Sequence, residues 1–412
     1  MDIKAIGKSA KAAAAVLSSI DAEKRAAALK EAARNLRRNI VFLLSENEKD
    51  LKIAKEAGLS DALIDRLMLN EARINSMADS IESIANIPDL LNKTIEEFKG
   101  LSGIKIKKVS VPLGVIGIIY EARPNVTADA AAICLKAGSA CVLRGGKEAI
   151  NSNIAIAKII NDAYAKCGMP NGTLNLIEDT SRESATALMN LRELSVIIPR
   201  GGKGLIKSTV ENSKVPVIET GSGNCHAYVD KGANLKMATD IVVNGKCQRP
   251  SVCNALETLL VHKDEAETFL PMVYSELKKY GCEIRGDDVT CRILKDAVPA
   301  TEEDYKTEFL DYIIAVKVVN NIDEAINHIA KYSSNHSEVI ITKNEENARR
   351  FQREVDSAAV YWNASTRFTD GGEFGFFAEI GISTQKIHAR GPMGIAQLLS
   401  YKYVIDGQGE IR

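Results

Sequence analysis

Two cysteines share a short polar segment, Lys246-Cys-Gln-Arg-Pro-Ser-Val-Cys-Asn-Ala255, which joins a predicted helix to a predicted strand. A polar segment interrupted by proline is typical of loops that carry catalytic side chains. A cysteine thiolate is a strong nucleophile, and a nearby cation such as Arg249 can lower the pKa of a thiol enough to form the thiolate at neutral pH. Free cysteines are more often simply buried, and residue type alone does not choose between Cys247 and Cys253.

Two glycine-rich turns show the pattern of a binding site. Each follows a predicted strand and precedes a predicted helix, and their sequences are Leu143-Arg-Gly-Gly-Lys-Glu148 and Ile198-Pro-Arg-Gly-Gly-Lys-Gly204. Turns in this position present backbone N–H groups to a phosphate, so Gly201 and Gly202 are candidate cofactor contacts. Neither turn is a G-x-G-x-x-G or Walker loop, and one alone could be an ordinary turn, but two in one run of βα units favour a nucleotide site.

Basic residues at the end of the predicted strand 140–144 bear on which nucleotide is bound. Arg144 and Lys147 lie where an acidic residue normally holds the 2′-hydroxyl of NAD, so they favour the 2′-phosphate of NADP. Surface charge that is simply solvated is the alternative explanation.

Three further polar segments follow predicted strands. Glu219 opens the small-residue turn Glu219-Thr-Gly-Ser-Gly-Asn224, where a carboxylate could act as a general base or acid. The other two are Tyr120-Glu-Ala-Arg-Pro-Asn125 and Asn363-Ala-Ser-Thr-Arg-Phe-Thr-Asp370. Both could equally be capped loops whose polar groups are satisfied internally.

The elements that must position these residues follow two kinds of periodicity. Residues 1 to 100 are rich in Ala, Leu, Lys and Glu at helical spacing and predict several helices. Residues 104–109 alternate like a strand, and 111–119 are nearly all apolar, so a buried strand is predicted to begin there.

Strands and helices then alternate on both sides of residue 223, which predicts two Rossmann-like α/β domains with parallel sheets. Strands are predicted at 140–144, 173–177, 195–198, 215–219, 226–229, 255–261, 312–319, 338–342 and 358–362. The late segment Tyr401-Lys-Tyr-Val-Ile405 reads as a strand without a neighbour in sequence. It could pair with another subunit or with the hairpin near 104–120.

Composition excludes several classes of protein. A chain of 412 residues with 45% hydrophobic and 26% charged residues is long enough for two or three globular domains. Its net charge of −1, with dispersed basic residues, argues against nucleic acid as a partner, and its short apolar runs argue against a membrane span. The 8 scattered cysteines argue against a metal site and indicate a reducing compartment, so a cytoplasmic location without a targeting peptide is expected.

Taken together, these segments resemble the aldehyde dehydrogenase superfamily, and within it the branch that reduces L-glutamyl 5-phosphate. The resemblance covers nearly the whole chain. Its most specific segments are Val111-Pro-Leu-Gly-Val-Ile-Gly117, Tyr120-Glu-Ala-Arg-Pro-Asn-Val126, Gln248-Arg-Pro-Ser-Val-Cys-Asn254 and Ile382-Ser-Thr-Gln-Lys-Ile-His-Ala-Arg-Gly-Pro392. It implies an α/β fold like that of the superfamily, with a small β segment for oligomerisation beside the two Rossmann-like domains.

The resemblance also implies a domain arrangement. Residues 1–107 and 126–223 would form the NADP-binding domain, and 224–360 the catalytic domain with the nucleophilic cysteine. Residues 108–125 and 375–412 would form the oligomerisation and β-flap segments. A homodimer or homotetramer is expected.

Single residues receive roles in the same way. The nucleophile of the superfamily falls on Cys253, which makes Cys247 a bystander. Asn125 takes the position of the asparagine that stabilises the oxyanion, and Glu219 that of the general base. Lys147 would approach the adenosine ribose, and a further residue, Glu308, the nicotinamide ribose.

The activity implied is the NADPH-dependent reduction of L-glutamyl 5-phosphate to L-glutamate 5-semialdehyde and phosphate, the second step of proline biosynthesis, through a thioester on Cys253. On charge alone, the candidate contacts for the phosphate and carboxylate of this substrate are Arg123, Arg367, His388 and Arg390. Functional coupling to a glutamate kinase is a further expectation. The alternatives are a hydrolytic or CoA-acylating aldehyde dehydrogenase, a nucleotide-binding regulatory protein without turnover, and a structural protein.

Overall fold

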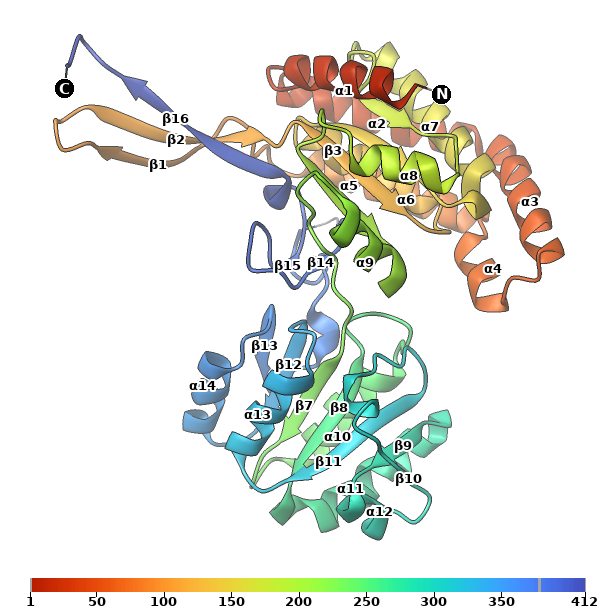
Figure 1. The fold of residues 1–412 in the computed structure, drawn as a ribbon, viewed down its shortest axis with the longest axis vertical. Coiled ribbons are helices and arrows are strands. Elements are labelled where there is room, and N and C mark those ends of the chain that lie inside the picture. Colours follow the sequence, from red (N-terminus) through yellow and green to blue (C-terminus); the bar gives the residue numbers. More distant parts are fainter. Residues whose placement is uncertain (1, 377–378, 412) are drawn as a thin grey trace. The chain divides into compact units, whose positions relative to one another are not determined.

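The computed structural model describes residues 2–376 and 379–411, and the chain forms two compact units (Figure 1). The first unit runs up to Thr220 and also includes Gly375–Gly381 and the chain from Met393 onward. The second unit comprises Gly221–Phe374 and Ile382–Pro392. Within the described residues, no helix combines the length and the apolar character needed to cross a membrane.

Five helices open the first unit, as predicted: α1 (Ile3–Leu17), α2 (Ala22–Arg38), α3 (Ile40–Glu56), α4 (Asp61–Leu67) and α5 (Glu71–Asn86). The side chain of Asp2 caps α1 by accepting from the N–H groups of Lys4 and Ala5. Strand β1 (Thr94–Lys99) is a correction to this helical prediction. All residues of β1 are exposed, so its sequence shows neither the helical nor the strand pattern of apolar residues. The strand forms through its antiparallel pairing with β2 (Lys105–Pro112).

A four-stranded parallel sheet of order β5-β4-β3-β6 forms the core of the first unit. Its strands are β3 (Val115–Tyr120), β4 (Ala140–Arg144), β5 (Leu174–Leu176) and β6 (Val196–Arg200), which alternate with α6 (Asn125–Lys136), the 3-10 helix η1 (Lys147–Ala149), α7 (Ile150–Lys166), α8 (Arg182–Met189) and α9 (Lys203–Asn212). Every residue of β3 is buried between two neighbouring strands. Residues 115–120 therefore belong to this sheet and not to the flap predicted over 108–125, and the buried strand begins at Val115 rather than at residue 111.

The strand predicted at 215–219 is wrong. Only Val217 forms an isolated parallel bridge, with Ile197 of β6. The backbone of this segment exchanges two hydrogen bonds with Ile197, one accepted by Pro216 and one donated by Ile218. Because Pro216 has no N–H to donate, a longer ladder does not form.

The strand predicted at 401–405 pairs within the chain. Strand β16 (Leu399–Asp406) lies antiparallel to β2, with Leu399 opposite Pro112 and Asp406 opposite Lys105. The resulting sheet, β1-β2-β16, extends away from the four-stranded sheet of the same unit (Figure 1). Of the two alternatives for this segment, the structure shows the pairing with the hairpin.

A seven-stranded parallel sheet of order β10-β9-β11-β8-β7-β12-β13 forms the second unit. Its strands are β7 (Cys225–Val229), β8 (Leu256–His262), β9 (Glu283–Gly286), β10 (Val298–Pro299), β11 (Ile313–Val319), β12 (Ser337–Ile341) and β13 (Ala359–Trp362). The helices are α10 (Leu235–Cys247), α11 (Lys263–Leu277), α12 (Asp288–Ile293), α13 (Ile322–Tyr332) and α14 (Glu345–Glu354). Short strands β9 and β10 at one edge were not predicted.

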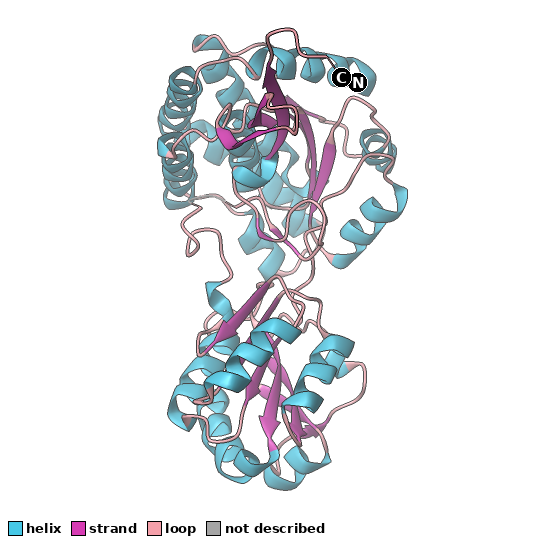
Figure 2. Ribbon diagram, turned by 90° about the vertical axis from the view of Figure 1, so that its left-hand side faces the viewer, coloured by secondary structure: helices cyan, strands magenta, loops and turns pink. Residues whose placement is uncertain are grey.

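Both faces of this sheet are covered by helices (Figure 2). Ala227 and Val229 of β7 enter the hydrophobic core that α10 and α11 complete, whereas Tyr228 between them enters a second core with α13 and α14. This alternation follows from the two-residue period of a strand. The remaining short elements are the 3-10 helices η2 (Lys278–Tyr280), η3 (Asp304–Lys306), η4 (Thr366–Phe368) and η5 (Ala396–Leu398), and the strands β14 (Ile382–Ser383) and β15 (Gly391–Pro392).

Candidate active site

Cys253 lies half-buried in the loop between the end of α10 and the start of β8. Gly223, which precedes β7, packs directly against its backbone: a Cβ built on Gly223 would lie 1.4 Å from the carbonyl oxygen of Cys253. The two residues meet because β7 and β8 are neighbours in the sheet. Cys247, the last residue of α10, is instead buried in the hydrophobic core of the second unit.

Glu308 is tied to this same segment. The backbone N–H of Gly223 donates to Oε1 of Glu308 at 2.7 Å. The structure therefore brings together Cys253 and Glu308, two residues that are far apart in the sequence and whose roles are both implied by the family resemblance. The residue that joins them, Gly223, was not recognised as a site residue.

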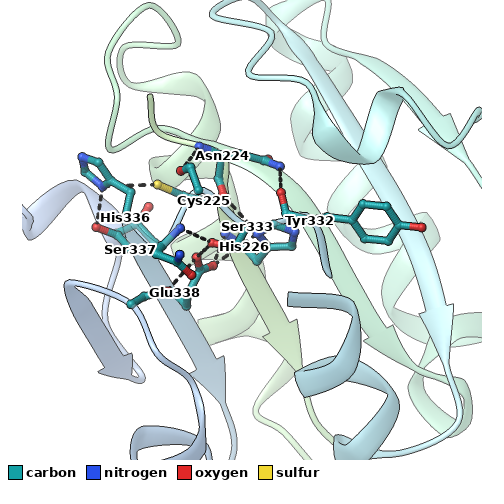
Figure 3. A network of polar contacts seen from close by, with 12 residues as sticks. Asn224, Cys225, His226, Tyr332, Ser333, His336, Ser337 and Glu338 are labelled. Atoms are coloured by element: carbon teal, nitrogen blue, oxygen red, sulfur yellow. Dashed lines mark hydrogen bonds and ion pairs between the residues drawn. The ribbon is translucent and has the colours of Figure 1, made fainter. Parts of the chain in front are cut away.

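The buried thiol of Cys225 forms a hydrogen bond with the cysteine loop. The Sγ atom of Cys225 donates to the carbonyl oxygen of Cys253 at 3.3 Å and lies 3.7 Å from Nδ1 of His336 (Figure 3). Burial, aided by the charge of Glu338, raises the pKa of Cys225 well above its ordinary value, so the thiol keeps the proton it donates. Cys225 therefore acts as a hydrogen-bond donor and not as a second nucleophile.

A network of buried polar groups continues from Cys225 (Figure 3). The N–H of His226 donates to Oε2 of Glu338 at 2.6 Å, and the imidazole Nδ1 of His226 contacts the carbonyl oxygen of Asn224 at 3.0 Å. The Asn224 amide donates in turn to the carbonyl oxygens of Tyr305 and Tyr332, both at 2.8 Å. Buried polar groups that are paired in this way fix one conformation of the backbone before β7.

Arg367 is the predicted anion contact that lies in the Cys253 region. Its Nε donates to Oε1 of Gln248 in the cysteine loop at 3.0 Å. Burial lowers the pKa of Arg367, as does the positive charge of Arg249, whereas Cys253 raises it. The nucleophile therefore lies within the electrostatic influence of a half-buried guanidinium, the environment that favours a thiolate.

The segment that carries Arg367 is anchored to the residue after the nucleophile. The side-chain amide of Asn254 donates to the carbonyl oxygens of Thr369 at 2.9 Å and Arg367 at 3.3 Å. In return, Oγ1 of Thr366 donates to the carbonyl oxygen of Asn254 at 2.8 Å. These three contacts hold the segment around Arg367 against the cysteine loop.

The other two predicted anion contacts of the second unit lie around the β14–β15 hairpin. Arg390 forms an ion pair with Asp356 at 2.8 Å, and Lys386 reaches the same carboxylate at 2.6 Å. His388, which lies between Lys386 and Arg390 in the sequence, is exposed. Arg390, predicted on charge alone to contact the anionic substrate, therefore already pairs with a carboxylate of the protein.

In the first unit, the two glycine-rich turns converge on Glu121, at the end of β3. The N–H of Gly202 donates to Oε2 of Glu121 at 2.9 Å, and a Cβ on Gly201 would lie 2.6 Å from the carboxyl carbon of Glu121. A Cβ on Gly146 would lie 3.5 Å from the Cα of Glu121. The convergence follows from the strand order, because β3 lies between β4 and β6. A glycine-lined edge of this kind suits close approach of a nucleotide phosphate to the backbone.

The two basic residues predicted to select NADP differ in their surroundings. Arg144 is half-buried, and its Nη2 donates to the carbonyl oxygens of Thr180 at 2.5 Å and Ser181 at 3.0 Å. Lys147 is exposed at the first position of η1. Arg144 therefore holds the loop after β5 in place, and Lys147 presents its charge to solvent.

Three further predicted residues lie in the first unit. Asn125 begins α6, and its amide donates to Oδ2 of Asp129 at 3.0 Å. Arg123 is exposed just before this helix, and Glu219 is half-buried directly before Thr220, the last residue of this part of the unit. Thr220 is fixed by a hydrogen bond from its Oγ1 to the carbonyl oxygen of Pro199 at 2.7 Å.

Comparison with known proteins agrees with this arrangement. A family model described as the aldehyde dehydrogenase family matches residues 1–291. A gamma-glutamyl phosphate reductase of Carboxydothermus hydrogenoformans is 57% identical over 408 residues, 99% of this chain and 98% of the relative. The crystal structure of gamma-glutamyl phosphate reductase from Thermotoga maritima has a TM-score of 0.98 at 47% identity and covers 100% of both chains. An acetylating aldehyde dehydrogenase from Geobacillus thermoglucosidasius shares the fold, with a TM-score of 0.70 at 18% identity. The comparison covers 100% of this chain and 97% of that one.

Proposed function

The chain belongs to the aldehyde dehydrogenase family, and on that premise we propose that it is a glutamate-5-semialdehyde dehydrogenase, also called gamma-glutamyl phosphate reductase. It reduces L-glutamyl 5-phosphate with NADPH to L-glutamate 5-semialdehyde and phosphate, the second step of proline biosynthesis. The observation that carries the proposal is the setting of Cys253: a half-buried thiol on a loop buttressed by Gly223 and Cys225 and close to the guanidinium of Arg367.

Cys253 supplies the nucleophile. Its thiolate attacks the acyl carbon of the substrate, phosphate leaves, and a thioester links the glutamyl group to the enzyme, which divides one difficult displacement into two easier steps. After reduction, the thiohemiacetal on Cys253 collapses, releasing the aldehyde and restoring the thiolate. The positive charge of Arg367 stabilises both the thiolate and an anionic substrate near it.

Negative charge develops on the carbonyl oxygen in both halves of the reaction. The backbone N–H of Cys253 and the side-chain amide of Asn125 are the proposed donors to this oxygen. The hydrogen bonds to the carbonyl oxygens of Cys253 and Asn254, from Cys225 and Thr366, keep the two peptide groups that follow the nucleophile from reorienting. Arg123, His388 and Arg390 remain candidates for the substrate carboxylate and phosphate.

The glycine-lined edge around Glu121 fits a nucleotide, and NADPH bound there would supply the hydride. Gly201 and Gly202 would contact its phosphates through the backbone, with the N–H of Gly202 exchanging its bond to Glu121 for one to a phosphate oxygen. Lys147, which is exposed, would reach the 2′-phosphate of the adenosine ribose, and Arg144 would shape the adjacent loop. Glu308 would contact the nicotinamide ribose.

Glu219 has a different task from that of a base that activates water, because hydrolysis would waste the thioester. We propose that it handles protons during collapse of the thiohemiacetal or orders its loop. Glu219→Gln separates these roles: unchanged turnover in both directions would eliminate the catalytic one.

Substrate choice tests the proposal directly. The protein should oxidise NADPH when given an acyl phosphate and should not do so with the corresponding CoA thioester. The opposite preference would assign it to the CoA-acylating enzymes of the family, and oxidation of NADPH by neither would overturn the proposed activity. A homodimer or homotetramer, a cytoplasmic location and functional coupling to a glutamate kinase are parts of the same proposal.

A further inference from the structure

A fully buried ion pair joins the two ends of the cysteine loop. Nζ of Lys246 lies 2.6 Å from Oε2 of Glu257, and both side chains are 0% exposed. Lys246 is the penultimate residue of α10 and Glu257 the second residue of β8, so Cys253 lies on the loop between them. Removing two charges from water costs free energy that their attraction does not reliably offset, and an apolar pair would often be at least as stable. Stability alone therefore does not account for this pair.

The second oxygen of Glu257 shows what else the pair does. Oε1 accepts the backbone N–H of Leu310 at 3.2 Å. Leu310 has a φ of 56°, in the left-handed region that residues with a Cβ rarely adopt. A conformation of this kind persists only where surrounding contacts hold it, and the carboxylate of Glu257 is one such contact.

Leu310 lies two residues after Glu308, whose carboxylate accepts the N–H of Gly223. Gly223 in turn packs on the backbone of Cys253. The contacts thus connect the two ends of the segment 308–310 to the cysteine loop. Leu310 is bound by Glu257, at one end of the loop, and Glu308 is bound by Gly223, which packs on Cys253.

We propose that Lys246 and Glu257 are positioning residues that couple the Glu308 segment to the Cys253 loop. Through this coupling, Glu308 and the nucleophile keep a fixed position relative to one another. The coupling itself follows from these contacts; only the contact of Glu308 with the nicotinamide ribose rests on the proposed function. Lys246 orients the carboxylate, and Glu257 transmits that orientation to Leu310. Neither residue touches the reacting atoms.

Two double variants isolate the contact with Leu310. Lys246→Met with Glu257→Leu removes both charges and the acceptor, whereas Lys246→Met with Glu257→Gln removes the charges but keeps a carbonyl oxygen that Leu310 can use. Lys236→Met is the matched control on the same helix, because Lys236 pairs with Asp240 at 3.1 Å and both side chains are exposed. Each protein is measured for thermal unfolding, for the rate at which iodoacetamide alkylates Cys253 without cofactor, and for the Kd of NADPH by titration.

We expect the Leu variant to remain folded, to change the alkylation rate and to weaken NADPH binding by about tenfold, the effect of about 1.4 kcal/mol. The Gln variant should stay within about threefold of the native protein in both measurements, as expected when the acceptor is kept. Native alkylation and native Kd in a folded Leu variant would overturn the proposal, and so would equal losses in the two double variants. If the Leu variant does not fold, the Gln variant is compared with Lys236→Met. A changed alkylation rate together with weakened NADPH binding in the Gln variant would then contradict the role of the acceptor.

Glu308→Gln separates this inference from the proposed function. If it leaves the Kd of NADPH unchanged while the Leu double variant still alters alkylation of Cys253, the cofactor role of Glu308 fails and the coupling stands. If Glu308→Gln weakens NADPH binding and the Leu double variant changes nothing, the coupling fails and the proposed function stands.

Discussion

Gly223 presses so closely on Cys253 that a methyl group at position 223 would overlap the carbonyl oxygen of the cysteine, at 1.4 Å. The atoms it would meet are backbone, which cannot swing aside as a side chain can. Glycine at this position is thus a requirement of the loop that presents the nucleophile.

Gly223→Ala should therefore displace the cysteine loop and lower kcat/KM by about a hundredfold or more, since a displacement of about 1 Å at a reacting group has that effect. Steady-state kinetics and the alkylation rate of Cys253 measure it. Gly407→Ala is the control, because the nearest atom there, at 2.9 Å, belongs to the side chain of Glu410 and not to the backbone. Native kinetics in Gly223→Ala would show that the loop does not need this contact.

The thiol of Cys225 should matter through the proton it donates to the carbonyl oxygen of Cys253. Cys225→Ser keeps a donor at this position, whereas Cys225→Ala removes it. We expect Ala to lower kcat by roughly tenfold, the effect of about one hydrogen bond, and Ser to lower it less. If Ser is impaired as much as Ala, the size or polarity of the sulfur matters and not its donation.

Arg367 should lower the pKa of Cys253 and attract the anionic substrate. Arg367→Gln is expected to shift the pH profile of Cys253 alkylation upward by about one unit and to raise the KM for the acyl phosphate, because a cation near a thiol favours the thiolate. Arg367→Lys, which keeps the charge, should shift the profile less. An unchanged profile in Arg367→Gln would leave Arg249 as the cation that matters.

His328 should make the second unit sensitive to acid. Burial lowers its pKa to about 2, with further lowering by His226 and Lys317, so the folded protein keeps it neutral. The unfolded chain takes up a proton near its ordinary pKa of about 6.5, so the free energy of unfolding falls as the pH drops below that value.

His328→Phe should remove this loss. Among the described residues neither ring nitrogen of His328 has a hydrogen-bond partner, and the ring packs against Tyr305 and Tyr332. Phe should therefore match or exceed the native stability at pH 7, and should gain about 2 kcal/mol relative to the native protein at about pH 5. Urea unfolding at the two pH values measures the difference, and an equal acid loss in both proteins would contradict it.

The regular elements were predictable wherever the apolar period is strong. Strand β4 lies at the predicted residues 140–144, and β7 (Cys225–Val229) contains the predicted strand 226–229. The errors fall where a local pattern competes with a distant partner. Exposed β1 exists only through pairing with β2, and Pro216 prevents a strand that its apolar neighbours favour.

The candidate site was less accessible to such reasoning. Cys253 was chosen over Cys247 through the family resemblance, and burial of Cys247 in the core now supplies an independent physical reason. Gly223 and Cys225 could not be recognised, because their contacts with the nucleophile depend on β7 and β8 being neighbours in the sheet. The pair of Lys246 and Glu257 carried one signal in the sequence: the carboxylate of Glu257 lies in a strand whose neighbouring residues are mostly apolar.

Phosphate-dependent reduction of NADP in the presence of L-glutamate 5-semialdehyde tests the central claim most directly, because phosphate must cleave the thioester in this direction. The native protein should form NADPH beyond the single equivalent released when each Cys253 becomes acylated only when phosphate is present, and Cys253→Ser should be inactive while Cys247→Ser keeps its activity. Sustained turnover of NADP without phosphate, or undiminished activity in Cys253→Ser, would contradict the account.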